Sequence, residues 1–152
     1  MPSTGRILGL DVGERRIGVA ISDPEGRLAV PLRVLERRGD EADMQAIISL
    51  ARTEGVDLVL IGDPLSLDGS VGQQARRVRT FAGRLAKASG LAVELWDERL
   101  SSVQAQRGRS IPERRRARGL RRRGPEDDLA AAIVLQSYLD RQRADSAPVS
   151  RA

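Results

Sequence analysis

The sequence contains neither cysteine nor histidine, and these two absences remove several classes of functional site. Without cysteine, the chain cannot form a disulfide or a thiolate metal site. Without histidine, it lacks the usual zinc ligand and the most common general base at neutral pH. Any hydrolytic chemistry must therefore use carboxylates, lysine, hydroxyl groups or a hard metal ion.

Long apolar runs and a secretory leader are missing as well. The 152 residues, 40% of them hydrophobic, are enough for one domain with a single core. Residues 1–6 lead directly into an apolar, strand-like run, without the charged and apolar regions of a signal peptide. The sequence therefore predicts a cytoplasmic protein that does not associate with membranes.

Lysine is almost absent, with one residue in the chain, whereas arginine is concentrated in one segment. Residues 107–123 carry nine arginines against one acid, Glu113, for a local net charge of +8; because the whole chain carries +5, the remainder carries −3. The planar guanidinium group suits bidentate contacts with phosphates. We therefore expect a mobile segment at 107–124 that contacts nucleic acid, the alternative being an ordinary solvated surface. Its arginines are Arg107, Arg109, Arg114, Arg115, Arg116, Arg118, Arg121, Arg122 and Arg123.

Hydrophobic periodicity predicts three strands, then a helix, a strand, a helix, a strand, a short helix over 100–106 and a final helix from Pro125. The helix over 40–54 ends at Gly55, and Ser70 with Gln73 suggests a capping box for the next helix. This order predicts an α/β fold with a five-stranded mixed sheet, three antiparallel strands followed by two parallel ones, and helices on both faces. We expect a single domain over 1–143 and a disordered tail over 144–152.

Acidic residues recur where the predicted strands end and where the last helix begins. They are Asp11, Asp63, Asp97, Glu98, Asp127 and Asp128. Each has a local explanation as a turn former, a strand-end residue or a complement to the helix dipole. In α/β sheets, however, such positions converge at one edge, where several carboxylates would repel each other unless cations lay among them. Oxygen ligands alone favour Mg²⁺ or Mn²⁺, and a pair of such ions with a basic segment nearby points to a phosphodiester substrate.

Four motifs in register closely resemble one known family. They are 8–13 with 16–20, 68–70, 97–101, and Asp127 with 130–131 and 133–139. The chain resembles, from about Arg6 to Asp140, the YqgF (RuvX) family of pre-16S rRNA nucleases and Holliday-junction-resolvase-like proteins. The resemblance implies a ribonuclease H-like fold and a metal-dependent nuclease.

The same resemblance assigns roles to individual residues. It implies that Asp11, Glu98 and Asp127 are the catalytic acids that hold two Mg²⁺ or Mn²⁺ ions, and that Arg16 and Arg99 contact phosphates. Several points stay open. Asp63 stands where the family usually has leucine, so it could be an additional ligand. Asp97 competes with Glu98, and Asp128 with Asp127, because the pattern does not fix which side chain faces the site.

The resemblance leaves several functions open. The first is cleavage at the 5′ end of precursor 16S rRNA during ribosome biogenesis. The second is resolution of branched DNA in recombination and repair, which would require a homodimer because two strands are cut at paired positions, whereas an RNA nuclease could be a monomer. The third is a nucleic-acid-binding module without catalysis. An actin-like or sugar-kinase phosphotransferase is disfavoured, because those proteins need two such domains.

Overall fold

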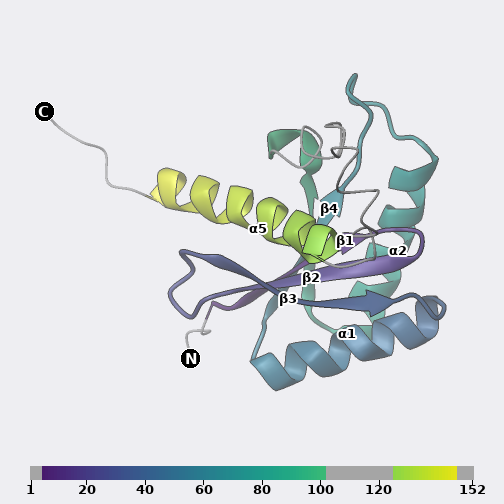
Figure 1. Cartoon of the computed structure of the whole chain (residues 1–152), viewed down its shortest axis with the longest axis horizontal. Helices are drawn as coiled ribbons and strands as arrows, with labels where there is room; N and C mark the ends of the chain where they lie inside the picture. Colours follow the sequence, from purple (N-terminus) through teal and green to yellow (C-terminus); the bar gives the residue numbers. More distant parts are fainter. Residues whose placement is uncertain (1–4, 102–124, 147–152) are drawn as a thin grey trace, which may run out of the picture.

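The computed structural model describes residues 5–101 and 125–146, with the side chains of 125–128 and 146 excepted. These residues form five strands, three α-helices and one 3₁₀ turn (Figure 1). In chain order they are β1 (Ile7–Val12), β2 (Arg16–Ser22), β3 (Ala29–Glu36), α1 (Asp40–Glu54), β4 (Leu58–Asp63), α2 (Gln73–Ser89), β5 (Ala92–Asp97), the 3₁₀ turn η1 (Glu98–Leu100) and α5 (Pro125–Ser146). No helix in this described part of the chain is long and apolar enough to cross a membrane.

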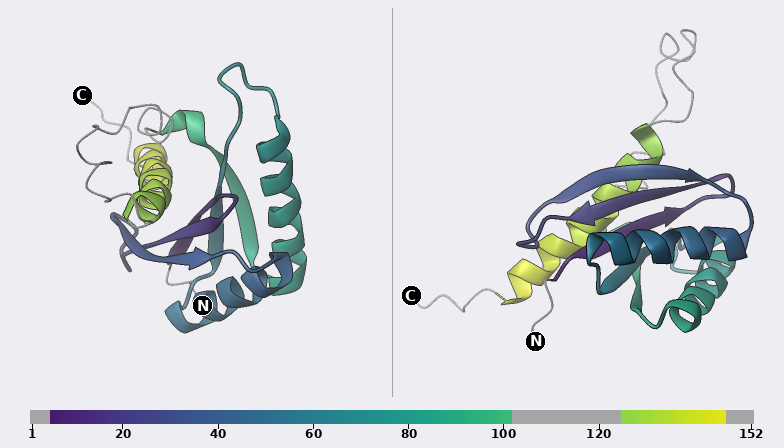
Figure 2. Two further views of the ribbon diagram at one scale, coloured as in Figure 1. Left: turned by 45° about the vertical axis from the view of Figure 1, so that its right-hand side comes forward. Right: turned by 90° about the horizontal axis from the view of Figure 1, so that it is seen from below.

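The strands form one sheet in the order β3-β2-β1-β4-β5, with β1 at its centre. β1 is antiparallel to β2 and parallel to β4, β3 is antiparallel to β2, and β5 is parallel to β4. Helices α1 and α2 cover one face of the sheet, and α5 crosses the other (Figure 2). The predicted mixed sheet with helices on both faces is confirmed.

Side chains of β1 alternate between two cores, as the pleat of a strand requires. Leu8, Leu10 and Val12 belong to the core under α1 and α2, whereas Ile7 belongs to the core under α5. Gly9 also faces α5, since a Cβ atom there would lie 3.0 Å from Cβ of Leu135. The next residue with this orientation is Asp11, which therefore faces α5.

Two helix boundaries differ from the sequence predictions. The predicted capping box is wrong, because α2 begins at Gln73 after an N-cap at Gly72 that makes no side-chain hydrogen bond. Ser70 remains in the preceding loop, where its N–H donates to Oδ1 of Asp68 at 2.9 Å. At the other end of the chain, α5 continues to Ser146, three residues beyond the predicted end of the domain.

Candidate active site

Asp11 lies near the carboxyl end of the central strand, on the face that α5 covers, and is 9% exposed. Its partner on β2 is Gly18. On β4, Gly62 lies one residue beyond the last registered pair, Leu10 with Ile61. The residues of β2 and β4 next to this carboxylate are therefore both glycines.

Glu98, the first residue of η1, is 1% exposed and lies over Gly62. A Cβ atom at Gly62 would be 2.7 Å from Oε2 of Glu98 and 3.2 Å from its Cγ. Gly62 follows the alternation of β4, in which Leu60 packs under α5, so it faces the same side as Asp11. The carboxylates of Asp11, near the end of β1, and Glu98, directly after β5, thus face the same side of the sheet, with β4 between the two strands.

The backbone around Glu98 is fixed by hydrogen bonds. Its carbonyl oxygen accepts from N–H of Ser101 at 3.1 Å and from Oγ of the same residue at 2.9 Å. Oγ of Ser137, on α5, donates to the carbonyl of Leu100 at 3.0 Å and accepts from Nε1 of Trp96 at 3.1 Å. These contacts join η1 to α5.

The first turn of α5 lies toward the end of the sheet that carries Asp11. Ala131 and Leu135 contact Gly9 of β1. Further along the helix, Oε1 of Gln136 accepts from N–H of Ala29, the first residue of β3, which lies level with the amino end of β1. The helix therefore runs away from the Asp11 end, with the backbone of residue 127 one turn before Ala131. The side chains of Asp127 and Asp128 lie outside the described residues, so the choice between them stays a prediction.

Asp63 and Asp97 are register partners on β4 and β5, and each forms an ion pair with an arginine. Asp63 contacts Arg79 of α2, with 2.8 Å between Nη2 and Oδ2. Asp97 contacts Arg99, also with Nη2 and Oδ2, at 2.7 Å, and hydrogen bonds from this arginine lower the pKa of Asp97. Arginines of the protein itself thus supply the counter-charge for both Asp63 and Asp97. Of the two alternatives Asp97 and Glu98, Glu98 is the residue that lies on the α5 side of the sheet.

The described side chains do not by themselves form a complete metal site. Among side chains that the structure describes, no three acids lie together as a metal-binding group. Asp11 and Glu98 supply two carboxylates, and a third would have to come from the first turn of α5. Oxygen donors of this kind suit Mg²⁺ and Mn²⁺.

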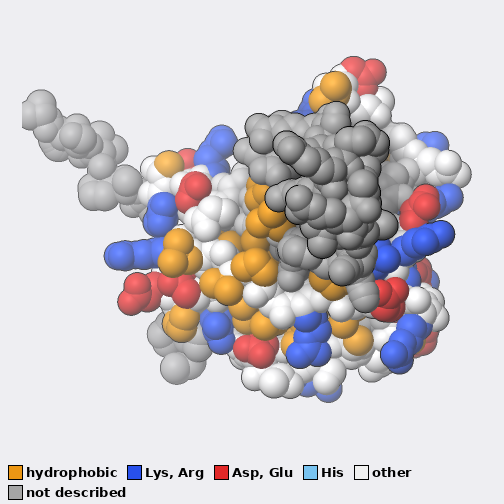
Figure 3. Space-filling model, viewed as in Figure 1, with side chains coloured by type: hydrophobic (Ala, Val, Ile, Leu, Met, Phe, Trp, Pro, Cys, Tyr) orange, Lys and Arg blue, Asp and Glu red, His pale blue; other side chains and the backbone are white. Residues whose placement is uncertain are grey.

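Arg16 begins β2 and alternates with Gly18 and Ala20, which places it on the same face as Asp11. Its Nε lies 3.4 Å from Oε2 of Glu36 in a partly exposed ion pair. The nine predicted contact arginines between 107 and 123 lie outside the described residues. Over the described part of the face in Figure 3, basic and acidic side chains are interspersed.

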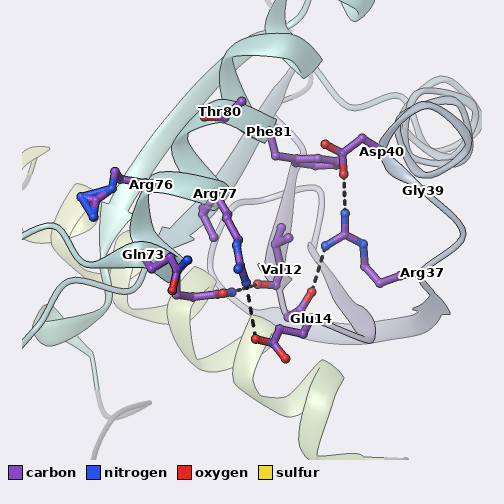
Figure 4. Close-up of a pocket in the computed structure, with 13 residues that line it drawn as sticks. Val12, Glu14, Arg37, Gly39, Asp40, Gln73, Arg76, Arg77, Thr80 and Phe81 are labelled. Atoms are coloured by element: carbon purple, nitrogen blue, oxygen red, sulfur yellow. Dashed lines mark hydrogen bonds and ion pairs between the residues drawn. The ribbon is translucent and has the colours of Figure 1, made fainter.

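A cavity of about 880 Å³ lies on the other face, between the β1–β2 turn, α1 and α2 (Figure 4). Arg37 at its edge donates to the carbonyl of Gly13 at 2.9 Å, forms ion pairs with Asp40 and Asp43 at 2.6 and 2.8 Å, and packs over the Phe81 ring. Because Val12 lines this cavity and Asp11 points the opposite way, the cavity is separate from the acidic site.

Two residues were not predicted from the sequence, Gly62 in the site and Arg37 on the opposite face of the sheet. Gly62 was read only as a neighbour of Asp63, although a glycine at the end of a buried strand signals close approach by another group. Arg37 carried no distinguishing signal among the many arginines of the chain, since its partners come from three separate segments.

A family model described as "RuvX: Holliday junction resolvase" matches residues 5–141. The chain belongs to the RuvX family. A relative from Pelotomaculum thermopropionicum is 45% identical over 90% of this chain and 88% of its own length. A second, from Symbiobacterium thermophilum, is 46% identical over 91% and 94% of the two chains. Both are named "Putative pre-16S rRNA nuclease".

Among solved structures, this RuvX-family chain is similar to RuvC of T. thermophilus in complex with a Holliday junction substrate. The TM-score is 0.62 over 93% of this chain and 97% of the other, at 11% sequence identity. A second structure of Thermus thermophilus RuvC gives a TM-score of 0.55 at 13% identity, with 91% and 96% of the two chains covered. At such low identity these likenesses establish a shared fold, in agreement with the ribonuclease H-like architecture predicted from the sequence.

Proposed function

We propose that this RuvX-family chain is a metal-dependent nuclease that hydrolyses phosphodiester bonds. The observation that carries the proposal is the pair of buried carboxylates on one face of the sheet, Asp11 near the end of β1 and Glu98 directly after β5, with Gly62 of β4 between the two strands. Asp127, or Asp128 beside it, would complete the set from the start of α5.

The donors fit a hard divalent cation. Carboxylate oxygens are the ligands that Mg²⁺ and Mn²⁺ prefer. The chain has no histidine or cysteine, so its carboxylates are the ligands that it can offer to such an ion at this face of the sheet. Two bound Mg²⁺ or Mn²⁺ ions would supply activation of the attacking water and neutralisation of the phosphate.

The protein's own contribution is positioning. Asp11 is fixed on the central strand, and Glu98 is held over Gly62 by its buried side chain and by the hydrogen bonds of η1. Arg16 lies on the same face and would contact a substrate phosphate. The basic segment 107–123 would hold the flanking nucleic acid through bidentate arginine contacts.

The substrate that we propose is precursor 16S rRNA, cleaved at its 5′ end during ribosome biogenesis in the cytoplasm. The names of the 45–46% identical relatives support this choice. A second candidate substrate is a four-way DNA junction, which the family description and the fold of RuvC favour. Junction resolution would require two copies of the chain, because two strands must be cut symmetrically.

Cleavage assays on both substrates test the proposal. Purified protein is incubated with precursor 16S RNA and with a four-way DNA junction, each with Mg²⁺, with Mn²⁺ and with chelator, while light scattering gives the oligomeric state. We expect metal-dependent cleavage of the RNA. Junction cleavage by a dimer would favour the resolvase instead, and RNA binding without cleavage of either substrate would reduce the chain to a binding module.

A further inference from the structure

We propose that Arg99 is a positioning residue for Glu98 and does not contact the phosphate. Together with Asp97 it forms a clamp that fixes the backbone on both sides of Glu98 and ties it to the loop over 64–72. This inference rests on the proposed nuclease function, because it assigns Glu98 to the metal-binding set.

The clamp closes around Glu98 from its two neighbours in sequence. Nε of Arg99 donates to Oδ1 of Asp97 at 3.0 Å, and Nη2 donates to Oδ2 at 2.7 Å. The backbone N–H of Arg99 also donates to Oδ1, at 2.9 Å. Because residues 97 and 99 are joined through both side chain and backbone, the residue between them has little freedom to turn.

The remaining nitrogen of the guanidinium group holds the loop that follows β4. Nη1 of Arg99 donates to the carbonyl of Leu67 at 3.3 Å, and a Cβ atom at Gly69 would lie 3.2 Å from the same nitrogen. The loop is a closed turn, in which N–H of Gly69 donates to the carbonyl of Ser66 at 2.7 Å. Each of the three guanidinium nitrogens thus donates to a protein acceptor, and a phosphate that bound the Nε–Nη2 edge bidentately would have to displace the Asp97 carboxylate.

The loop matters to Glu98 because it starts next to the glycine that accommodates the Glu98 side chain. Gly62 and Asp63 end β4 beside Trp96 and Asp97 of β5. By joining Asp97 to the loop carbonyl at Leu67, the clamp holds the ends of both strands in register. Loss of the clamp would let Glu98 move relative to Gly62, and with it the metal ligand relative to Asp11.

A second arginine–aspartate pair on the same two strand ends provides a matched control. Arg79 donates to Asp63 through Nε at 3.3 Å and Nη2 at 2.8 Å, which is the same bidentate arrangement. It lies on the α2 side of the sheet and does not flank Glu98. Breaking it removes an equivalent ion pair without touching the proposed clamp.

The test compares Arg99→Ala, Arg99→Lys and Asp97→Asn with the wild type. Titration calorimetry gives Mn²⁺ affinity of the full chain, and fluorescence anisotropy gives RNA affinity without metal at several salt concentrations. We expect all three variants to weaken Mn²⁺ binding by about 10- to 100-fold, as supporting residues of metal sites do. RNA affinity and its salt dependence should stay within twofold of wild type. Arg99→Lys should not restore Mn²⁺ affinity, because lysine lacks the planar guanidinium group that binds a carboxylate through two nitrogens.

In the control, Arg79→Lys should bind Mn²⁺ as the wild type does. The inference is overturned if Arg99→Ala weakens RNA binding and lowers the salt slope by about one while Arg99→Lys restores both, since that is the behaviour of a phosphate contact. It is also overturned if Mn²⁺ affinity is unchanged in all three variants. A wild type that binds Mn²⁺ but cleaves no substrate contradicts the proposed nuclease while leaving this test intact, whereas a wild type that binds no Mn²⁺ contradicts both.

Discussion

At the scale of single residues, glycine shapes the site as much as the acids do. Gly62 leaves the volume that the Glu98 side chain occupies, and Gly18 places no side chain on β2 in register with Asp11. Gly9 lets α5 approach to van der Waals contact through Leu135. These glycines allow two carboxylates to be buried on the face of the sheet that α5 covers.

Gly62→Ala should therefore impair catalysis while the protein still folds. The added Cβ atom would lie 2.7 Å from Oε2 of Glu98, so the side chain must move from its position. We expect metal-dependent cleavage to fall by about 10- to 100-fold. Gly83→Ala is the matched control, because a Cβ atom there meets nothing within 4 Å and alanine favours the helix by about 0.5–1 kcal/mol. Equal cleavage rates for the two variants would contradict the role of Gly62.

The sequence located Asp11 correctly at the carboxyl end of a buried strand, but it could not choose between Asp97 and Glu98. Alternation along β5 applies only as far as Asp97, where the strand ends and a 3₁₀ turn begins. The orientation of Glu98 depends on that turn and on the space above Gly62. Both are properties of the packed strands and leave no pattern within β5 itself.

At the scale of elements, Arg37 connects the turn after β1 to α1 and α2. It reaches the carbonyl of Gly13, the buried carboxylate of Asp43 and the ring of Phe81. The turn that it holds begins at Gly13, two residues after Asp11. Arg37 thus supports the carboxyl end of the central strand from the face opposite the site.

Replacing Arg37 with alanine should lower the free energy of unfolding by about 3 kcal/mol, because it leaves a buried carboxylate without its charge partner. Asp43 is 3% exposed and would keep only the backbone N–H of Arg38 as a donor. Urea denaturation measures the change. Arg27→Ala is the control, since the Arg27–Glu25 pair is exposed and 3.9 Å apart and should contribute little. An Arg37→Ala variant as stable as Arg27→Ala would refute this role.

Element types were largely predictable from periodicity, whereas one helix start was not. The helix over 40–54 was predicted with its observed bounds, since Gly55 adopts the left-handed conformation that ends it. The start of α2 was misplaced because Asp68 binds the N–H of Ser70 before that residue can cap the helix. A local side-chain contact of this kind competes with the capping pattern and is not visible in it.

At the scale of the whole molecule, charge is distributed unevenly along the chain. Residues 107–123 carry a net +8, and the rest of the chain is acidic. This segment enters the proposal through its composition alone, because it lies outside the described residues. Its role in binding is therefore tested through the salt dependence of RNA affinity.

Replacing Arg121, Arg122 and Arg123 with alanine should weaken RNA binding and lower the slope of log affinity against log salt by about 2, because fewer counterions are released. The control changes Arg27, Arg33 and Arg52 to alanine, which alters net charge equally at exposed positions outside the segment 107–123. Anisotropy titrations at several salt concentrations compare the two triple variants. A slope that matches the wild type would show that the segment is an ordinary solvated surface.

The central claim is that Asp11 holds metal for phosphodiester hydrolysis, and the most direct measurement is Mn²⁺-dependent cleavage of precursor 16S RNA by wild type and Asp11→Asn. The claim predicts that Asp11→Asn loses at least about 100-fold in rate while it binds the RNA normally without metal. Asp63→Asn, the same change at an acid paired with Arg79 on the other face, should retain cleavage. An Asp11→Asn variant that cleaves at the wild-type rate would contradict the claim.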